Sequence, residues 1–337
     1  MTHSTDRWDK GPFLARSPGE GRLLEQPWDS GTRLRIRISP GDLSTNHLGS
    51  GELEVPSGKS TQPRVELASD LIFYGVEGRG TLHSGKSSWP IGPDTTIWLP
   101  FGTPYSIEAS DNTLQLFWIA TPHGYETSYE RTENVSTLEE AISRTAPNTA
   151  RILTQNEFES YDNSDRVVVL SADEGPSFWQ PDPTRGYAAP ILTPALTHRP
   201  GFSMGLQVVG ANGGLLIPHA HARSEEMLLI LKGRGQATLN GHSLQVEPGS
   251  LIFAGRWVSH GLESVGPEDL WVLWFITPGE GLEHMLEGFG RPRKAGESEP
   301  APFPYPPTTG DLLEEFGQAT PRRQALQPEA PPATYRG

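Results

Sequence analysis

The chain has 337 residues, enough for two domains, and contains no cysteine. This excludes disulfides, thiolate metal ligands and a cysteine nucleophile, and it fits a reducing cytoplasm. The formal net charge is −14 without a basic run, so nucleic acid is not an expected partner. Because no segment approaches the roughly 20 apolar residues of a membrane span, and no signal-peptide pattern begins the chain, we expect a cytoplasmic protein without a membrane partner.

In chain order, a polar segment at 1–20 is predicted to be a flexible arm, and the chain then repeats itself once. Gly78–Pro122 and Gly233–Pro278 both begin with Gly-Arg-Gly, carry a central proline and end with a tryptophan four residues before a proline. Because a period this long indicates two copies of one domain, we predict domains at 21–125 and 186–290. A connector with a short helix (126–185) would join them, and a proline-rich tail with a short helix (291–337) would follow.

Each copy reads as short strands punctuated by turns. In the second copy, Leu239–His242 is predicted to be a tight hairpin turn, because Asn-Gly supplies positive φ values. Regularly spaced short strands favour a sandwich or a barrel. The strands predicted around this turn are Met227–Leu231, Ser243–Val246, Leu251–Phe253 and Leu270–Ile276. The predicted helices are Glu140–Arg144, after a capping box at Ser136–Glu139, then Gly281–Glu287 and Asp311–Phe316.

A group of metal-binding residue types begins at His219 and His221. Two residues apart on a strand, both rings would point to the same face, where paired imidazoles bind divalent transition metals. A lone His-x-His is more often a surface coincidence. Here, however, two acids follow at once, and His260 comes after a further pair of strands. Three histidines and one carboxylate on adjacent strands can surround one ion.

These residues carry a family resemblance. The pattern Gly213-x5-His219-x-His221-x4-Glu226-x6-Gly233 resembles the first motif of the cupin superfamily, and Gly249–Ser264 resembles the second, with His260 at the expected spacing. The second motif departs in three places, with Gly255 in place of proline, Trp257 in place of glycine and Ser264 in place of asparagine. Together with the repeat, the resemblance implies a bicupin, an all-β fold of two cupin jelly-roll β-barrels in tandem with a few short helices.

The choice between the two acids depends on a turn. On one unbroken strand Glu225, four residues after His221, would share the histidine face. A turn at Ala222–Ser224 would reset the alternation, and the motif spacing also selects Glu226. Glu225 is then expected to be a solvated charge or an acid at the pocket mouth. The predicted metal ligands are therefore His219, His221, Glu226 and His260.

The first copy keeps the frame of the repeat but not the ligands. The counterparts of His219, His221, Glu226 and His260 are, in that order, Arg64, Glu66, Leu71 and Tyr105. The family's Pro-x-Gly is retained there as Pro100-Phe101-Gly102. Since Glu66 alone cannot hold a transition metal, we predict a metal-free N-terminal barrel with a structural role.

Three imidazoles and a carboxylate leave open positions on a divalent ion. We expect one mononuclear ion, Fe(II) first, with Mn(II), Ni(II), Cu(II), Co(II) or Zn(II) as alternatives. A redox-capable ion would serve a dioxygenase that combines O2 with a small enolic, phenolic or diketone-like substrate, as the resemblance to quercetinase-like and aromatic-cleaving dioxygenases implies. A Lewis-acid ion would serve an isomerase, aminohydrolase or decarboxylase instead. A non-catalytic, small-molecule-binding bicupin is a third possibility.

The expected substrate pocket is apolar. Glu226 is a candidate for catalysis as well as for metal binding. Two of the apolar residues predicted for the pocket, Phe253 and Trp274, could instead be ordinary residues of the barrel core. The pocket residues are predicted to be Met204, Phe253, Trp257 and Trp274. The candidates for orienting a substrate oxygen are Arg223, Gln207 and Arg256. We expect a monomer or a homodimer.

Overall fold

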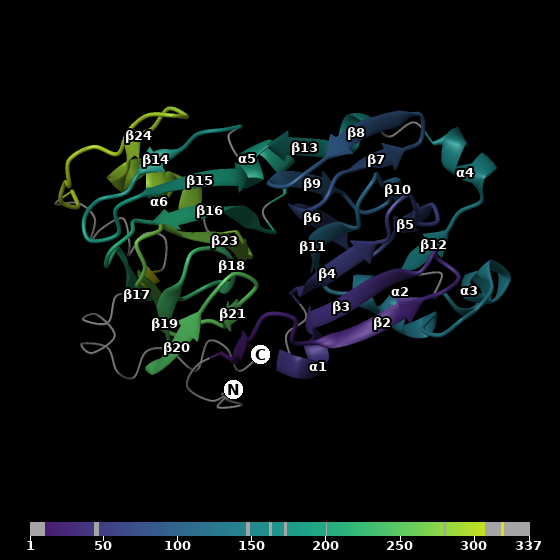
Figure 1. Ribbon diagram of the computed structural model, residues 1–337, viewed down its shortest axis with the longest axis horizontal. Coiled ribbons are helices and arrows are strands. Elements are labelled where there is room, and N and C mark those ends of the chain that lie inside the picture. Colours follow the sequence, from purple (N-terminus) through teal and green to yellow (C-terminus); the bar gives the residue numbers. More distant parts are fainter. Residues whose placement is uncertain are drawn as a thin grey trace. The chain divides into compact units, whose positions relative to one another are not determined.

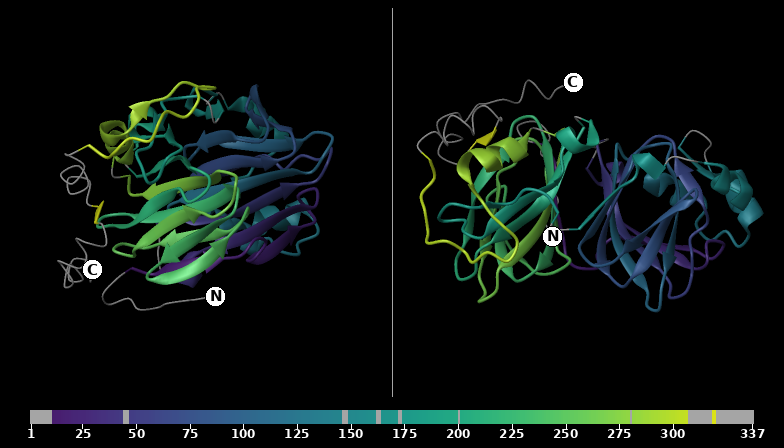
Figure 2. Two further views of the ribbon diagram at one scale, coloured as in Figure 1. Left: turned by 60° about the vertical axis from the view of Figure 1, so that its left-hand side comes forward. Right: turned by 90° about the horizontal axis from the view of Figure 1, so that it is seen from above.

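The computed structural model describes residues 11–43, 47–145, 149–161, 164–171, 174–199, 201–279, 281–306 and 318–319. The chain divides into two compact units: Glu20–Ala172, called the first barrel below, and Met1–Gly19 with Asp173–Gly337, called the second barrel. In each unit two mainly antiparallel sheets curve around a hydrophobic core (Figures 1 and 2). The predicted all-β fold with two tandem barrels is confirmed. Within the described ranges, no helix is long and apolar enough to cross a membrane.

The first barrel has a seven-stranded sheet, ordered β13-β9-β6-β11-β4-β3-β2, and a five-stranded sheet, ordered β12-β5-β10-β7-β8. The strands are β2 (Arg22–Gln26), β3 (Thr32–Ile38), β4 (Gly49–Val55), β5 (Arg64–Glu66), β6 (Asp70–Glu77), β7 (Gly80–Ser84), β8 (Ser87–Ile91), β9 (Thr95–Leu99), β10 (Pro104–Ala109), β11 (Leu114–Thr121), β12 (Ala150–Ile152) and β13 (Val168–Ser171). The helices are α1 (Pro40–Leu43), α2 (Tyr125–Arg131), α3 (Leu138–Arg144), α4 (Gln155–Ser160) and the 3-10 turn η1 (Ser164–Arg166).

The second barrel has an eight-stranded sheet, ordered β1-β21-β18-β23-β16-β15-β14-β24, and a five-stranded sheet, ordered β20-β19-β22-β17-β25. The strands are β1 (Phe13–Arg16), β14 (Phe178–Trp179), β15 (Tyr187–Leu192), β16 (Ser203–Val209), β17 (Leu215–His221), β18 (Glu225–Lys232), β19 (Gly235–Leu239), β20 (His242–Val246), β21 (Leu251–Ala254), β22 (His260–Ser264), β23 (Leu270–Thr277), β24 (Arg291–Pro292) and β25 (Gln318–Ala319). The helices are α5 (Pro194–Thr197) and α6 (Leu282–Phe289).

The core of each barrel follows the two-residue period of its strands. In the second barrel Leu228, Ile252 and Trp274, on three neighbouring strands, point into one buried apolar cluster. The residues before and after each of them on its own strand point to the other face of the sheet. Trp274 packs directly on Gly205, where an added Cβ would lie 2.4 Å from the indole ring. The missing side chain at Gly205 thus makes room for a large ring at the centre of the barrel.

The strands predicted in the second copy are confirmed, and so is the hairpin. Asn240 (φ 48) and Gly241 (φ 81) form its two central positions, between the paired residues Leu239 and His242. Of the predicted helices, Glu140–Arg144 lies within α3, but its N-cap is Thr137, one residue later than the predicted capping box. Gly281–Glu287 corresponds to α6, and Asp311–Phe316 lies outside the described residues.

The prediction of a flexible arm at 1–20 is wrong for Phe13–Arg16. Phe13–Arg16 form strand β1, which pairs antiparallel with β21 (the purple segment beside β21 in Figure 1). Phe13 and Leu14 are buried, and Phe13 belongs to the second barrel's core. The edge of β21 offers unpaired backbone groups that this segment satisfies, and burial of the two apolar side chains stabilises the pairing. The boundary between the two units, at 172–173, falls within the predicted connector.

Candidate metal centre

Strands β17, β18 and β22 bring the four predicted ligands together. His219 on β17 pairs directly with His260 on β22, and His221 lies two residues further along the same strand. Glu226 follows at the start of β18. One ligand atom from each of the four side chains can be chosen so that all lie within 4.8 Å of one another. This separation is suited to donors around a single ion.

Backbone carbonyls orient two of the three imidazoles. The Nδ1 atom of His219 lies 2.9 Å from the Ile217 carbonyl oxygen, and that of His260 lies 2.9 Å from the Val258 carbonyl oxygen. If each Nδ1–H donates there, each Nε2 keeps its lone pair for a metal. The Nε2 atom of His260 lies 2.5 Å from the Glu226 carboxylate. The Nε2 atom of His221 lies 3.1 Å from the same carboxylate oxygen. The donor atoms therefore converge on one point.

Burial and the neighbouring side chains shift the pKa values of two of the four groups, His219 and Glu226. Burial, with the neighbouring His260 and His221, lowers the pKa of His219 to about 3, so its imidazole is neutral. Burial opposes ionisation of Glu226, but the attraction and hydrogen bonds of His260 and His221 outweigh it and hold the pKa of that carboxyl well below its usual range. His219 is half-buried, whereas the other three are buried. The cluster is thus an oxygen and nitrogen donor set that is not sealed from solvent.

The bend between β17 and β18 separates the two acids as expected. Residues Ala222 and Arg223 form the bend, and β18 begins at Glu225. Glu226 belongs to the cluster, and Glu225 does not. The expectation that Glu225 is a solvated charge is wrong, because this residue is only 6 % exposed. It pairs with Thr277 in the sheet and, by strand alternation, points to the opposite face from Glu226.

The sheet register divides the predicted pocket residues into two groups. Glu226, its partners Ala254 and Ile276, and Trp274 share the face that lines the barrel interior. Trp274 lies one level below Ile276 and forms part of the apolar floor under the cluster. Trp274 is also a residue of the barrel core, so the two interpretations, pocket residue and core residue, describe the same position.

Met204 and Phe253 lie on the other face. Met204 pairs with Phe275, and Phe253 pairs with Met227, each one residue out of phase with the interior positions. Both side chains are fully buried there. Strand alternation therefore removes them from the space around the ligands, and the prediction that they line the substrate pocket is wrong.

Gln207 is too far along β16 to reach a substrate at the cluster. Ser203 pairs with Ile276, which pairs with Glu226, so Ser203 marks the level of the ligands. Gln207 is four residues further, roughly 13 Å along a strand. Its amide donates to the carbonyls of Tyr187 and Val208 at 3.3 and 3.1 Å. It is a structural residue of the barrel rather than a candidate catalytic one.

The remaining candidates lie in two connections near the ligands. Arg223 is exposed on the bend that follows His221. Arg256 and Trp257 are half-buried in the connection from β21 to β22. The Trp257 amide donates to the His221 carbonyl at 2.8 Å, which places this connection against the ligand strand.

In the first barrel the same positions hold a buried ion pair. Arg64 pairs with Tyr105 in the sheet, as His219 pairs with His260. The Arg64 Nε donates to Glu66 at 2.9 Å, and both side chains are only 4 % exposed. The guanidinium also lies over the ring of Tyr129 at 4.5 Å. Within the described part of the first barrel there is no cluster of metal-ligand type. The Arg64 guanidinium, an internal cation, lies at the positions where the second barrel presents its candidate metal ligands.

Helix α2 supplies the other neighbours of Arg64, which the sequence pattern did not single out. The rings of Tyr125 and Tyr129, one helical turn apart, contact each other edge to face at 5.1 Å between centroids, and Ser128 accepts a hydrogen bond from the guanidinium. The spacing Tyr-x3-Tyr was the available signal, because it puts both rings on one helix face. Burial raises the pKa of Glu66, although the adjacent Arg64 works against that rise.

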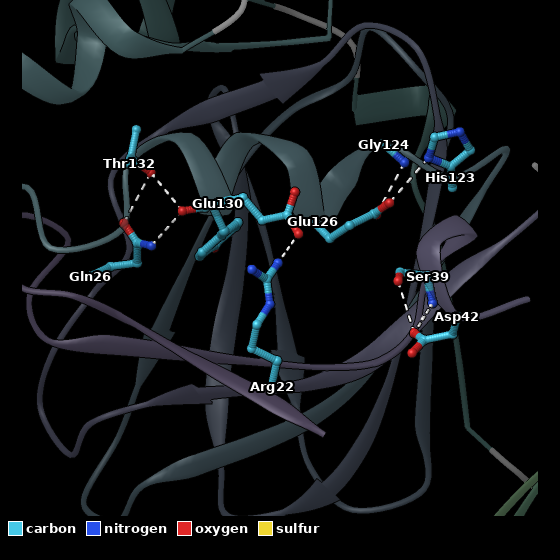
Figure 3. A network of polar contacts seen from close by, with 10 residues as sticks. Arg22, Gln26, Ser39, Asp42, His123, Gly124, Glu126, Glu130 and Thr132 are labelled. Carbon is cyan, nitrogen blue, oxygen red and sulfur yellow. Dashed lines mark hydrogen bonds and ion pairs between the residues drawn. The ribbon is translucent and has the colours of Figure 1, made fainter. Parts of the chain in front are cut away.

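A polar network fixes α2 in this position (Figure 3). At its start, Glu126 accepts from the Gly124 amide and contacts the His123 Nδ1, both at 3.1 Å. At its end, Gln26 on β2 donates to the Tyr129 carbonyl at 2.9 Å. Arg22 pairs with Glu130 on the outer side of the helix. These contacts hold the two tyrosines against the guanidinium.

Comparison with known proteins agrees with this geometry. Residues 205–276 match the family model described as a cupin domain. No curated protein sequence matches the chain. One similar solved structure is protein Ylba from E. coli, at 13 % identity and a TM-score of 0.56 over 82 % of this chain and 93 % of that one. The putative glyoxylate induced protein from Pseudomonas aeruginosa is similar at 14 % identity and a TM-score of 0.57, over 78 % of this chain and 87 % of that one.

A variant of oxalate decarboxylase from Bacillus subtilis is also similar, at 14 % identity and a TM-score of 0.55, covering 79 % of this chain and 77 % of that one. At such identities the likeness concerns the fold alone. The match to the cupin family model lies within the second barrel, and the likeness of the whole chain to these structures is one of fold, with two barrels in tandem.

Proposed function

We propose that this chain is a bicupin and a metal-dependent enzyme with one mononuclear centre, held by His219, His221, Glu226 and His260. The observation that carries the proposal is the convergence of these four donors within 4.8 Å. Imidazole nitrogens and a carboxylate suit a divalent first-row transition metal. The absence of thiolates and the partial exposure of His219 favour an open, reactive centre over a closed structural zinc site.

The chain's own residues prepare the site in two ways. The Ile217 and Val258 carbonyls each lie 2.9 Å from an imidazole Nδ1, and a hydrogen bond from Nδ1–H there would turn the Nε2 lone pair toward the ion, so that little rearrangement would be needed when it binds. Ile276 beside Glu226 and Trp274 one level further into the barrel present an apolar surface on the same face as Glu226, which would suit the face of a planar organic substrate. A bound ion would supply Lewis acidity and, if redox-active, a route for electrons.

We propose a dioxygenase reaction in the cytoplasm, with Fe(II) as the first choice of metal and a small enolic, phenolic or diketone-like substrate beside O2. The apolar floor supports this choice, because such substrates combine a flat apolar body with an anionic oxygen for the metal. Of the predicted pocket and orienting residues, Arg223 and Trp257 lie nearest in sequence to a ligand, two residues after His221 and three before His260, and we propose that they contact the substrate. Glu226 would serve as a proton acceptor beside its role as a ligand.

A non-oxidative reaction is the second candidate. It is favoured by a specific observation: similar structures include a variant of oxalate decarboxylase. In that case the same centre would bind a small carboxylate and act as a Lewis acid, and O2 would not be consumed.

One experiment separates these possibilities. Protein purified anaerobically is analysed for metal, and O2 uptake is then followed with a panel of phenols, diketones, flavonols and small carboxylates. Uptake that is lost in His219→Ala, but kept in His83→Ala on the outside of the first barrel, supports the dioxygenase. Full turnover without O2 contradicts it and supports the second candidate. Failure to bind any of Fe, Mn, Co, Ni, Cu or Zn contradicts both and leaves a metal-free binding protein.

A further inference from the structure

The connection between β21 and β22 is a β-turn whose third residue has an unusual backbone. Val258 donates to the Gly255 carbonyl at 3.0 Å, which closes the turn over Arg256 and Trp257. Trp257 has φ 63, a value that glycine normally supplies at this position of a turn. A tryptophan there is strained by its Cβ. The turn leads within two residues to His260, so its geometry bears directly on the ligands.

The first barrel contains the same turn built from favourable residues. Thr103 donates to the Pro100 carbonyl at 3.1 Å, and Gly102 at the third position has φ 76. The Gly102 amide donates to the Glu66 carbonyl at 2.6 Å. The Trp257 amide makes the equivalent bond to the His221 carbonyl at 2.8 Å. In the first barrel Gly102 takes its positive φ without a Cβ, and two side chains also hold the turn, since the Phe101 amide donates to Asp70 at 2.9 Å and the Phe101 carbonyl accepts from Arg166 at 3.1 Å.

In the second barrel the N-terminal segment holds the turn from outside. Gly11 donates to the Arg256 carbonyl at 2.7 Å, and Gly255 donates to the Pro12 carbonyl at 2.8 Å. A Cβ on Gly11 would lie 2.6 Å from the Arg256 nitrogen, and one on Gly255 would lie 2.5 Å from the Pro12 oxygen. A proline at 255 would have neither the space nor the N–H. The residues that depart from the cupin motif, Gly255 and Trp257, therefore lie in the turn that this segment contacts, and Gly255 leaves the space and the N–H that the contact needs.

We propose that Gly11–Arg16 is a positioning element of the metal centre. It supplies the support that Pro-x-Gly, together with Asp70 and Arg166, gives the turn in the first barrel, and it acts through the turn on two ligands. Through the Trp257 amide it holds the His221 carbonyl, and through Val258 it holds the carbonyl that faces the His260 Nδ1. The β1 strand continues this contact, since Phe13 pairs with Ala254, the neighbour of Glu226. This inference rests on the proposed metal centre.

Gly11→Ala in the full chain is the direct test, with Co(II) as the probe added to metal-free protein. The added Cβ forces the segment away from Arg256, and the expected result is a Co(II) dissociation constant raised roughly tenfold, the scale of effects seen when a group behind a ligand is lost. The visible Co(II) spectrum should change as well, because the imidazole positions relax. Gly201→Ala is the matched control in the same unit, since its added Cβ meets nothing within 4 Å. It should change neither quantity.

Repeating the test in a Trp257→Gly background shows whether the N-terminal segment acts on the ligands through the turn. Trp257→Gly relieves the strained turn, so Gly11→Ala introduced into Trp257→Gly should weaken Co(II) binding much less than it does in the natural chain. Equal losses in both backgrounds would overturn the proposal.

Hydrogen exchange at the Gly255 amide shows directly whether the segment has withdrawn. Faster exchange in Gly11→Ala with unchanged Co(II) affinity and spectrum would also overturn the proposal, and would leave the proposed function intact. Failure of the natural chain to bind Co(II) would overturn both.

Discussion

Arg64→Met tests whether an internal cation stabilises the first barrel where the second presents metal ligands. The change removes the 2.9 Å bond to Glu66 and the contact with the Tyr129 ring, and it leaves a carboxylate in a site that is 4 % exposed. Ser128 stays satisfied, because its hydroxyl also donates to the Tyr125 carbonyl at 3.0 Å. Breaking a buried ion pair from one side costs about 3–5 kcal/mol, and we expect that loss in the free energy of unfolding of the first barrel.

The double variant Arg64→Met/Glu66→Leu is the control for this reasoning. It removes the orphaned carboxylate as well, so most of the lost stability should return, since a buried pair and an apolar pair of similar size differ little. Urea-dependent hydrogen exchange of peptides from β6 and β11 measures the first barrel separately, which a single unfolding curve of a two-unit chain does not. If the double variant is as unstable as Arg64→Met, the ion pair is not the reason for the loss. Co(II) binding should be unchanged in both variants.

The remaining predictions concern pH, the choice of acid and the barrel floor. Burial raises the pKa of Asp29 from 3.8 to about 6, so the folded state favours its protonated form. The stability from this group is complete below pH 3.8 and is lost as the pH rises through 6. At 1.36 kcal/mol per pKa unit, the unfolding free energy of the natural protein relative to Asp29→Asn should fall by ~3 kcal/mol across this range, and a constant difference would refute the assignment. Glu226→Gln should abolish most Co(II) binding while Glu225→Gln retains it, measured by absorption titration; equal losses would put both acids at the metal. Gly205→Ala should destabilise the second barrel by about 1–3 kcal/mol, because its Cβ meets the Trp274 ring at 2.4 Å, and hydrogen exchange of β16 and β23 checks this.

The sequence by itself determined the repeat, the all-β class and the four side chains that the structure brings together as candidate metal ligands. These features are local: the two-residue period, the Asn-Gly hairpin and the His-x-His spacing each act over a few residues. The choice of Glu226 over Glu225 also followed from the sequence, because a bend of three residues decides which face each acid takes. The loss of ligands in the first copy was visible from alignment with the second.

Tertiary structure decided which residues surround the site and what holds it in place. Met204 and Phe253 looked suitable for a pocket by composition, but the register of β16 and β21 puts them on the opposite face from Glu226. The partners of Arg64 come from a helix more than sixty positions away. The N-terminal segment reaches a turn at Gly255 through backbone hydrogen bonds, which carry no signature of residue type. Contacts between distant segments depend on how strands pair, and that pairing is set only when the whole barrel closes.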